Sequence, residues 1–283
     1  MMRILLVGGT SALGKVLRPI LAQFSEVITA GRKGCDVEID LTWPSEKICL
    51  PTNIDVVINV VAHFGGDSFD AICTSEIVNA VGALKLCNAS VKINAKHFIH
   101  ISSINVLLDS TSEYFGAYSL SKRHADDLIQ LYCEKANLAY AILRPSQIYG
   151  DQDEFKKHQF FLYDCVDKAL RDDDIIIYGS RNPMRNYLHI EDLCKLISAV
   201  VTKRIKGIYS CANPKDSTIL EVADAAIRAA GSSSSVIFNG EKRDISDNIF
   251  VHDDALYRLA GIYPEIDIEE GITRLVISKM EGV

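Results

Sequence analysis

A tyrosine and a lysine four residues apart, Tyr118 and Lys122, are the residues of this sequence whose types and spacing have the clearest chemical use. Side chains four apart lie on one face of a helix, so the phenol and the ammonium group would be neighbours. An adjacent ammonium group lowers the pKa of a phenol from about 10 towards the working pH, which lets the tyrosine give or take a proton beside a hydride transfer. The spacing also arises by chance on exposed helices, so the surrounding elements must decide its meaning.

Two further polar residues stand where they can join this pair. Ser103 directly follows the apolar run His97–Ser102, and the carboxyl edge of an open parallel sheet is where strands deliver side chains to a ligand. We expect its hydroxyl to hydrogen-bond the reacting oxygen. Asn79, with Gly82 shortly after it, supplies an amide that would fix the backbone near the lysine through water. The predicted catalytic set is Ser103, Tyr118, Lys122 and Asn79.

A glycine-rich segment follows the first apolar run. Residues 8–14 have the sequence Gly-Gly-Thr-Ser-Ala-Leu-Gly and lead into a helical pattern. Glycines let the backbone approach a pyrophosphate, and the free N–H groups of a helix N-terminus attract its charge. Ser11 stands where the G-x-x-G-x-x-G pattern has its middle glycine, and its hydroxyl can still reach a phosphate. The segment predicts a dinucleotide site formed by Gly8, Thr10, Ser11, Ala12, Leu13 and Gly14.

Two cations follow the second apolar run. Arg32 and Lys33 stand where a protein that binds NAD usually has an acidic residue for the 2′-hydroxyl of the adenosine ribose. A guanidinium group can instead hold a 2′-phosphate through two parallel hydrogen bonds, which favours NADP, with NAD as the alternative. The plainer interpretation is that both cations are solvated loop charges. Asp40 and Leu41 end the next short run, where folds of this kind meet the adenine ring.

The elements that must position these residues alternate between strand and helix. Continuous apolar runs of strand length are separated by segments with helical periodicity, such as Ser68–Val91 and Tyr118–Ala136. This alternation predicts a doubly wound parallel α/β sheet of the Rossmann type, covered on both faces. The expected strands are Ile4–Val7, Glu26–Ala30, Asp55–Ala62, His97–Ser102, Ala139–Arg144 and Gly207–Cys211.

The pattern changes after Gly150, which predicts a second domain. A polar stretch leads to a helix at Gln159–Leu170, a short strand at Ile175–Tyr178 and further helices at Asp192–Lys203, Ile219–Ala230 and about Asp253–Leu259. We expect a dinucleotide-binding domain from residues 1–150 plus about 186–212. Residues 151–185 plus 213–283 would form a smaller C-terminal α/β domain that binds substrate.

The composition is ordinary for a globular enzyme and excludes several classes of protein. The 283 residues are 48% hydrophobic, and a net charge of −7 provides no basic surface for nucleic acid. The N-terminal apolar run is too short for a signal peptide or a membrane span. The eight cysteines form no C-x-x-C pair, and no cluster of histidine, cysteine and carboxylate residues suggests a metal. We expect a cytoplasmic protein without nucleic-acid or membrane partners.

Several segments match one known family in order along almost the entire chain. They are Gly8 to Gly14, Asn79 with Gly82, Ser102-Ser103, Tyr118 with Lys122, the Arg-Pro-Ser-Gln-Ile-Tyr-Gly of residues 144–150 and the Arg-Asn-Tyr-Leu-His-Ile-Glu-Asp-Leu of residues 185–193. Together they resemble the extended short-chain dehydrogenase/reductases, the epimerase and dehydratase superfamily. The resemblance implies an NAD(P)-dependent oxidoreductase or epimerase with Ser103, Tyr118 and Lys122 as catalytic residues.

The resemblance also implies contacts with both ligands. Val60, Val61 and Ala62 would line the ribose of the cofactor, which Lys122 would also hold, and the backbone after Pro145 would face the nicotinamide. Arg185 would grip the diphosphate of a nucleotide-linked sugar, Tyr178 and Gly179 would lie near its base, and Arg243 would be a second anion contact. A surface salt bridge is the alternative role for each arginine. The implied substrate-binding residues are Ser103, Gln147, Tyr178, Arg185 and Arg243.

The residues after the serine bear on the reaction. Relatives that dehydrate sugars resemble one another in an Asp-Glu pair directly after the active serine or threonine, whereas this chain has Ile104 and Asn105, which cannot serve as the acid and base of an elimination. Arg32 favours exchangeable NADPH and therefore reduction of a 4-keto group on a nucleotide sugar. A nucleotide-sugar C4 epimerase with tightly bound NAD(P) is the alternative. A shortened segment between Ser103 and Tyr118 allows a bulkier substrate.

Two further expectations remain. Some Rossmann relatives bind NADP as sensors without catalysis, but they typically lack the tyrosine and lysine that are present here. Relatives of the family dimerise through the helices that correspond to Ser68–Val91 and Tyr118–Ala136, so the resemblance implies a homodimer.

Overall fold

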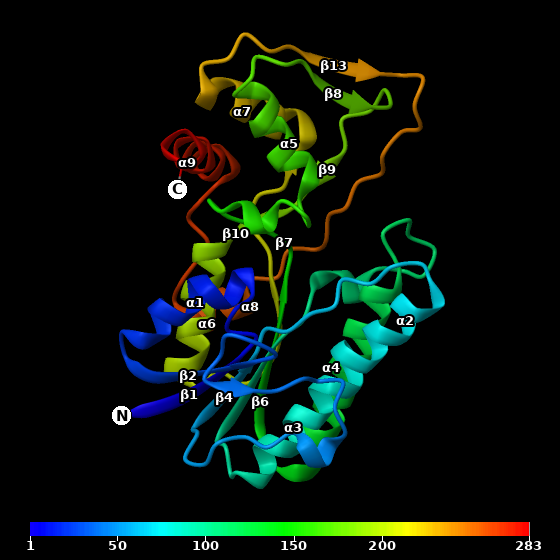
Figure 1. The fold of residues 1–283 in the computed structure, drawn as a ribbon. Coiled ribbons are helices and arrows are strands. Elements are labelled where there is room, and N and C mark those ends of the chain that lie inside the picture. The colour runs from blue at the N-terminus through cyan, green and yellow to red at the C-terminus, as the bar shows by residue number, and fades with distance from the viewer. Residues whose placement is uncertain (283) are drawn as a thin grey trace. The chain divides into compact units, whose positions relative to one another are not determined.

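The computed structural model describes residues 1–282 and contains a seven-stranded sheet in the order β11-β6-β5-β4-β1-β2-β3. Every neighbouring pair of strands in this sheet is parallel (Figure 1). The doubly wound α/β class predicted from the alternating pattern is confirmed. The strands are β1 (Met2–Val7), β2 (Ser25–Gly31), β3 (Val37–Glu38), β4 (Val56–Asn59), β5 (His97–Ile101), β6 (Ala139–Pro145) and β11 (Gly207–Cys211).

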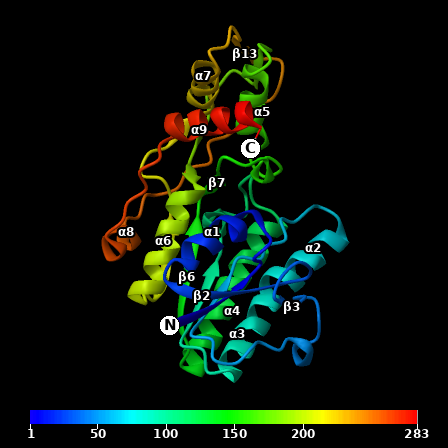
Figure 2. The same ribbon diagram turned by 60° about the vertical axis from the view of Figure 1, so that its left-hand side comes forward.

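Helices cover both faces of the sheet, and every residue of its strands β4 and β5 is buried. In Figures 1 and 2, α3 and α4 lie on one face, and α1 and α6 lie on the other. Leu86 of α3 and Ile129 of α4 share one buried cluster with Val57 and Phe98 of the sheet. The helices are α1 (Ala12–Ala22), α2 (Phe69–Ser75), α3 (Gly82–Lys92), α4 (Ala117–Ala136), α6 (Ile190–Lys203) and α8 (Ala255–Ala260).

The chain divides into two compact units. Unit 1 comprises Met1–Pro145, Cys194–Cys211 and Asp253–Ile262, and unit 2 comprises Ser146–Leu193, Ala212–His252 and Tyr263–Val283. The sequence led us to expect residues 213–283 wholly in the second domain, whereas α8 groups with the sheet. Lys203 Nζ at the end of α6 donates a hydrogen bond to the carbonyl of Ala260 at 2.6 Å, which ties α8 to unit 1.

Unit 2 combines three helices with three two-stranded sheets. Its strand pairs are β7 (Gln147–Tyr149) with β10 (Tyr187–His189), β8 (Ile175–Tyr178) with β13 (Val236–Asn239), and β9 (Met184–Arg185) with β12 (Ser217–Thr218). Its helices are α5 (Phe160–Ala169), α7 (Ile219–Ala230) and α9 (Ile268–Glu281). A capping box of Thr218 and Glu221 starts α7, and Gly231 in a left-handed conformation ends it.

The single helix expected over Ser68–Val91 is interrupted. A π-helical turn, Glu76–Val81, separates α2 from α3 and carries Asn79. Such turns insert a residue into a helix and are frequent at functional sites. The next residue, Gly82, lies so close to Leu41 that an added Cβ would be 2.8 Å from the Leu41 Cβ. The small residue therefore lets the helix approach the segment that follows β3.

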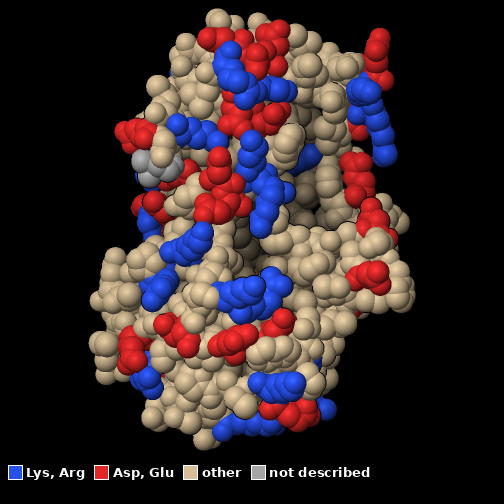
Figure 3. All heavy atoms as spheres, in the orientation of Figure 1, with Lys and Arg blue, Asp and Glu red and all other residues tan. Residues whose placement is uncertain are grey.

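Charge is distributed without a dominant sign on the face shown in Figure 3, where Lys and Arg side chains are interspersed with Asp and Glu. This distribution agrees with the net charge of −7 and differs from the basic face of a nucleic-acid-binding protein. Within residues 1–282, no helix has both the length and the apolar character that crossing a bilayer requires.

Candidate active site

The glycine-rich turn between β1 and α1 has the backbone geometry of a phosphate-binding turn. Gly8 has φ of +95°, and a Cβ added to Gly14 would lie 2.3 Å from the carbonyl oxygen of Gly8. Side chains at these two positions would therefore block the turn. Ser11 is the N-cap of α1, and its Oγ accepts a hydrogen bond from the Gly14 N–H at 3.1 Å. Its hydroxyl thus has a structural use besides the phosphate contact expected from the sequence.

The end of β2 carries exposed cations and a carboxylate that the sequence analysis missed. Arg32 and Lys33 are both exposed. The Asp36 carboxylate accepts hydrogen bonds from the Thr29 backbone N–H at 2.8 Å and from the Thr29 hydroxyl at 2.7 Å, which hold its pKa below the ordinary value. A negative charge therefore lies beside β2, although four residues further along than the usual acidic position of an NAD site.

The expected adenine segment lies near these cations. Burial raises the pKa of Asp40, but hydrogen bonds from Thr42 and the charges of Arg32 and Lys85 outweigh that effect and lower it. Leu41 is buried against Gly82. The segment that follows β3 is thus packed against the start of α3, while the carboxylate of Asp40 remains charged.

Lys122 joins the carboxyl ends of two strands. Its Nζ donates a hydrogen bond to the carbonyl of Ile101 at 2.8 Å and another to that of Val61 at 3.3 Å. Val60 and Lys122 are buried, and Val61 and Ala62 are partly buried. The structure therefore brings the predicted lysine next to the predicted cofactor segment.

Ser103 and Tyr118 face each other across the same edge of the sheet. Ser103 follows β5 and is the N-cap of the 3₁₀ helix Ile104–Leu107, and Tyr118 lies in the first turn of α4. A side-chain hydrogen bond joins the two residues. The strand-tip hydroxyl and the helical phenol, separated by fifteen positions in the sequence, thus meet as the sequence analysis expected.

The pKa of Tyr118 differs from the lowered value that the sequence analysis predicted for a phenol beside Lys122. Burial raises the pKa of Tyr118 to about 12, against a smaller lowering effect of the Ser103 hydrogen bond. Burial also lowers the pKa of Lys122 to about 8, although the nearby Asp126 charge opposes this change. The expected fall in the phenol pKa is wrong, because the Lys122 ammonium donates to backbone carbonyls and desolvation of the phenol dominates.

Asn79 links three elements around the lysine. Its Nδ2 donates to the carbonyl of His63 at 2.7 Å and to the Ser121 Oγ at 2.9 Å, and its Oδ1 accepts from the His63 N–H at 2.8 Å. Both backbone groups of His63 are thus held by one side chain that is 1% exposed. The asparagine fixes the backbone directly, beside the residue that precedes Lys122.

An ion pair beneath the lysine was not anticipated. Asp126 is 1% exposed, lies one helical turn after Lys122, and accepts a hydrogen bond from Arg144 Nε at 2.8 Å. Burial raises the pKa of Asp126 despite the nearby charges of Arg144 and Lys122. The four-residue spacing from Lys122 was the available signal in the sequence. Pro145, next to Arg144, ends β6 and pairs with Cys211 of β11.

Unit 2 brings several predicted substrate residues close together. The Asp244 carboxylate accepts hydrogen bonds from the backbone N–H groups of Ser180 and Arg181, so the segment that contains Arg243 lies against the turn after Tyr178. Arg185 is 8% exposed, and its guanidinium donates to the carbonyls of Met184 and Ser246, each at 2.8 Å. Tyr178 is 54% exposed.

Gln147 lies on another strand pair of unit 2. Its backbone N–H donates to the carbonyl of Asn186 at 3.2 Å, next to Arg185. Its Oε1 is buried and has no hydrogen-bond partner within the described residues. An unpaired buried acceptor is costly in a folded protein, so this amide is suited to a ligand that donates a hydrogen bond.

Comparison with known proteins explains why these features occur together. Residues 4–212 match the NAD dependent epimerase/dehydratase family. The chain belongs to this family. A putative UDP-glucose 4-epimerase of Methanocaldococcus jannaschii is 28% identical over 159 residues, which are 56% of this chain and 52% of that protein. The aligned part therefore spans about half of that relative.

Solved structures of other proteins have the same fold as this member of the epimerase/dehydratase family. The UDP-glucose 4-epimerase of Thermotoga maritima, solved with UDP-glucose, has a TM-score of 0.82 and 18% identity over 99% of both chains. A protein of Pseudomonas aeruginosa solved with NADPH has a TM-score of 0.81 and 16% identity over 100% of both chains. At such low identity these likenesses establish the fold alone.

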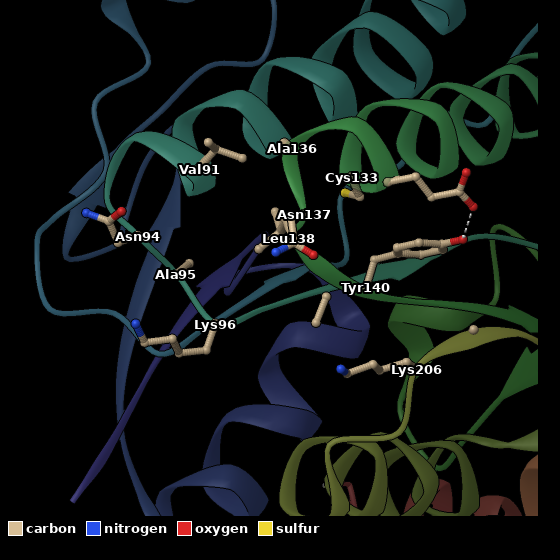
Figure 4. Close-up of a pocket in the computed structure, with 13 residues that line it drawn as sticks. Val91, Asn94, Ala95, Lys96, Cys133, Ala136, Asn137, Leu138, Tyr140 and Lys206 are labelled. Atoms are coloured by element: carbon tan, nitrogen blue, oxygen red, sulfur yellow. Dashed lines mark hydrogen bonds between the residues drawn. The ribbon is translucent and has the colours of Figure 1, made fainter.

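A hollow of about 770 Å³ lies elsewhere, at the edge of the sheet where β5 and β6 begin (Figure 4). Lys96, Asn137 and Tyr140 line it, and the Tyr140 hydroxyl donates to Glu134 Oε1 at 3.1 Å. In contrast, the glycine-rich turn, Val60 and Ser103 follow the opposite, carboxyl ends of β1, β4 and β5. The hollow is therefore separate from the candidate active site.

Proposed function

We propose that this protein reduces a keto group of a nucleotide-linked sugar, the 4-keto group in the first instance, with Tyr118 as the proton donor. The observation that carries the proposal is the arrangement at the carboxyl edge of the sheet: Tyr118 in the first turn of α4 meets Ser103 after β5, and Lys122, one helical turn later, donates to the carbonyls of Ile101 and Val61. When bound, the dinucleotide supplies the hydride that forms the new C–H bond at the carbonyl carbon.

The chain's own residues would complete the reaction in defined roles. Ser103 hydrogen-bonds the carbonyl oxygen, and Tyr118 transfers its proton to that oxygen as the negative charge develops, which yields the hydroxyl group. Lys122 holds the ribose of the cofactor and supports the phenolate with its positive charge. Asn79 acts as a positioning residue, because it holds the backbone of His63 and the side chain of Ser121.

We further propose NADP as the cofactor. The turn at Gly8 and Gly14 fits a pyrophosphate, since side chains there would block it. The exposed cations Arg32 and Lys33 are available for a 2′-phosphate. The alternative is NAD, and one observation favours it: the charged Asp36 carboxylate lies beside β2, where it could accept a hydrogen bond from a ribose hydroxyl.

For the substrate, we propose that unit 2 holds the nucleotide portion. Arg185 and Arg243 would bind the diphosphate, Tyr178 the base, and Gln147 a hydroxyl that satisfies its unpaired Oε1. Two of the proteins named above support the substrate class: the Methanocaldococcus jannaschii relative is named a putative UDP-glucose 4-epimerase, and the Thermotoga maritima epimerase was solved with UDP-glucose. Dehydration is a poorer fit, since Ile104 is buried and neither it nor Asn105 can give or take the proton.

A C4 epimerase is the second candidate, and the UDP-glucose 4-epimerase names of two relatives favour it. The two functions differ in whether they consume cofactor. A reductase consumes one NADPH for each product and needs added cofactor, whereas an epimerase interconverts its sugars with cofactor that stays bound.

A panel experiment separates these functions. The purified protein is incubated with 4-keto sugars linked to dTDP, GDP, CDP and UDP plus NADPH, and separately with UDP-glucose plus NAD, with products identified by mass spectrometry and chromatography. Reduction is supported if one NADPH is oxidised for each product molecule formed and the product is heavier than the substrate by two hydrogens. Formation of UDP-galactose without net cofactor consumption would replace reduction by epimerisation. Equal activity of Tyr118→Phe would remove the tyrosine from either mechanism, and no turnover with tight NADPH binding would favour a sensor.

We also propose a homodimer in the cytoplasm. The π-helical turn and α4 carry exposed apolar side chains, among them Ile77, Val81 and Leu131, which a second copy would cover. The eight cysteines are all free, as in a reducing compartment. Light scattering of Val81→Glu beside the unchanged protein tests the dimer: a mass near 31.3 kDa for the unchanged protein would overturn it.

A further inference from the structure

Phe64 stacks on the tyrosine of the candidate active site. The ring centroids of Phe64 and Tyr118 are 5.2 Å apart and the ring planes differ by 15°. Phe64 remains 52% exposed and lies in the segment that follows β4. The phenylalanine thus covers one face of the phenol ring while its own other side stays accessible.

The residue before Phe64 is held from several directions. Asn79 forms hydrogen bonds with both the N–H and the carbonyl of His63. The His63 ring nitrogen Nδ1 lies 3.0 Å from the Ser75 Oγ and 3.3 Å from the N–H of Gly65. The backbone on both sides of Phe64 is therefore anchored, so the position of its ring over Tyr118 is built into the loop.

The two glycines after Phe64 pack closely on two helices, Gly65 on the start of α4 and Gly66 on α2. Gly65 has φ of +87°, and a Cβ added there would lie 3.0 Å from the backbone nitrogen of Tyr118. Gly66 has φ of +146°, and its added Cβ would lie 2.9 Å from the Ala71 Cβ. Only glycine adopts this close and left-handed path without strain. Gly65 lets the loop approach α4 closely enough for the aromatic rings to meet, and Gly66 lets the chain turn close against α2.

We propose that Phe64 is a positioning residue that holds the Tyr118 ring in its proton-donating orientation and keeps water from one face of it. This inference rests on the proposed function, because it assigns Phe64 a role in proton transfer from Tyr118. Stacked aromatic pairs stabilise their arrangement beyond the area they bury. Apolar cover also keeps the neutral phenol favoured over the phenolate, which preserves the proton until the substrate accepts it.

Variants at this position separate a structural role from the proposed one. Phe64→Ala removes the ring, Phe64→Leu keeps apolar bulk, and Phe64→Tyr keeps the stack. Phe69→Ala is the matched control, since Phe69 is 79% exposed and lies in the neighbouring helix α2. The measurements are kcat and KM with dTDP-4-keto-6-deoxyglucose, the Kd of NADPH, the pH dependence of kcat, and proton NMR of the Tyr118 ring, assigned with Tyr118→Phe.

The expected result is a change in proton transfer without a change in cofactor binding. In Phe64→Ala, kcat falls about twofold to tenfold, the Kd of NADPH is unchanged, and the pKa of Tyr118 moves down towards 10 as water reaches the phenol. Phe64→Tyr restores kcat, Phe64→Leu is intermediate, and Phe69→Ala behaves as the unchanged protein.

Other outcomes overturn the inference. It fails if Phe64→Ala leaves kcat, its pH dependence and the ring-current shift of Tyr118 unchanged, or if KM and the Kd of NADPH rise while kcat stays constant. A protein that neither binds NADPH nor turns over the dTDP sugar contradicts the proposed function instead. In that case the NMR titration of the Tyr118 phenol still decides whether Phe64 controls it.

Discussion

The residues around Tyr118 and the cations after β2 represent two opposite ways of building a ligand site. Lys122 and Asn79 are each 1% exposed and hold fixed backbone partners. Arg32 and Lys33 are exposed. Hydrogen bonds hold the groups of the first region in one arrangement, which suits proton transfer at a fixed atom. The second region consists of exposed cations outside this hydrogen-bond network, so a change of cofactor preference there would leave the chemistry intact.

The largest effect is expected at the phenol. Tyr118→Phe removes the proton donor but keeps the ring against Phe64, so kcat should fall about 100-fold to 10,000-fold. NADPH binding, followed by fluorescence titration, should be unchanged, because the hydroxyl contributes to the reaction rather than to the fold. Retention of more than a tenth of the original kcat would place the proton donor elsewhere and break the distinction between the two regions.

A smaller effect is expected at the exposed cations. Arg32→Ala removes a charge-assisted contact with a 2′-phosphate, so the Kd of NADPH should rise about 10-fold to 100-fold while that of NADH changes little. Isothermal titration with both cofactors measures this, and Lys15→Ala, at a lysine of helix α1, serves as a charge control. An equal rise in the Kd of NADPH and of NADH in Arg32→Ala would favour NAD. So would a larger rise in the Kd of NADH than in that of NADPH in Asp36→Ala.

The lysine predicts a pH dependence for the free enzyme. Burial lowers the pKa of Lys122 to about 8, so its charge is present below that pH and lost above it. The kcat/KM should therefore fall about tenfold for each pH unit above 8. A flat kcat/KM between pH 7 and 10 would show that the charge is not needed.

The same shift affects stability with a definite sign. Because the folded pKa of Lys122 lies below the unfolded value of 10.5, the folded state loses its proton first. The stability contribution of this group therefore rises between pH 8 and about 10.5. The free energy of unfolding in urea should therefore increase across this pH range in the unchanged protein. The part of the increase that Lys122 contributes should be absent in Lys122→Met.

The smallest change in activity is expected at Asp126, one helical turn after Lys122. Asp126→Asn removes a negative charge that raises the pKa of Lys122, so the alkaline limb of kcat/KM should move below pH 8 by less than about one unit. Loss of the charged hydrogen bond with Arg144 should also cost about 2 kcal/mol of unfolding free energy. Asp127→Asn, at an exposed neighbour, is the control. Identical pH profiles for both variants would limit Asp126 to a structural role.

Much of the fold and part of the candidate site could be predicted from local patterns. Strand and helix periodicities placed six of the strands in the large sheet. The helix α9 was missed, although Asp267 precedes an apolar pattern at Ile272, Leu275 and Val276. The strand β13 was missed because half-exposed residues such as Ile237 and Phe238 follow a serine-rich loop and resemble an irregular segment.

The sequence by itself determined the glycine turn, the four-residue spacing of Tyr118 and Lys122, and the strand that delivers Ser103, because each depends on neighbours in the chain. Only the tertiary structure decided that Asn79 holds His63, that Phe64 covers Tyr118, and that burial sets the ionisation of the phenol and the lysine. Hydrogen bonds between distant segments and desolvation depend on how the elements pack, and no local spacing records that packing.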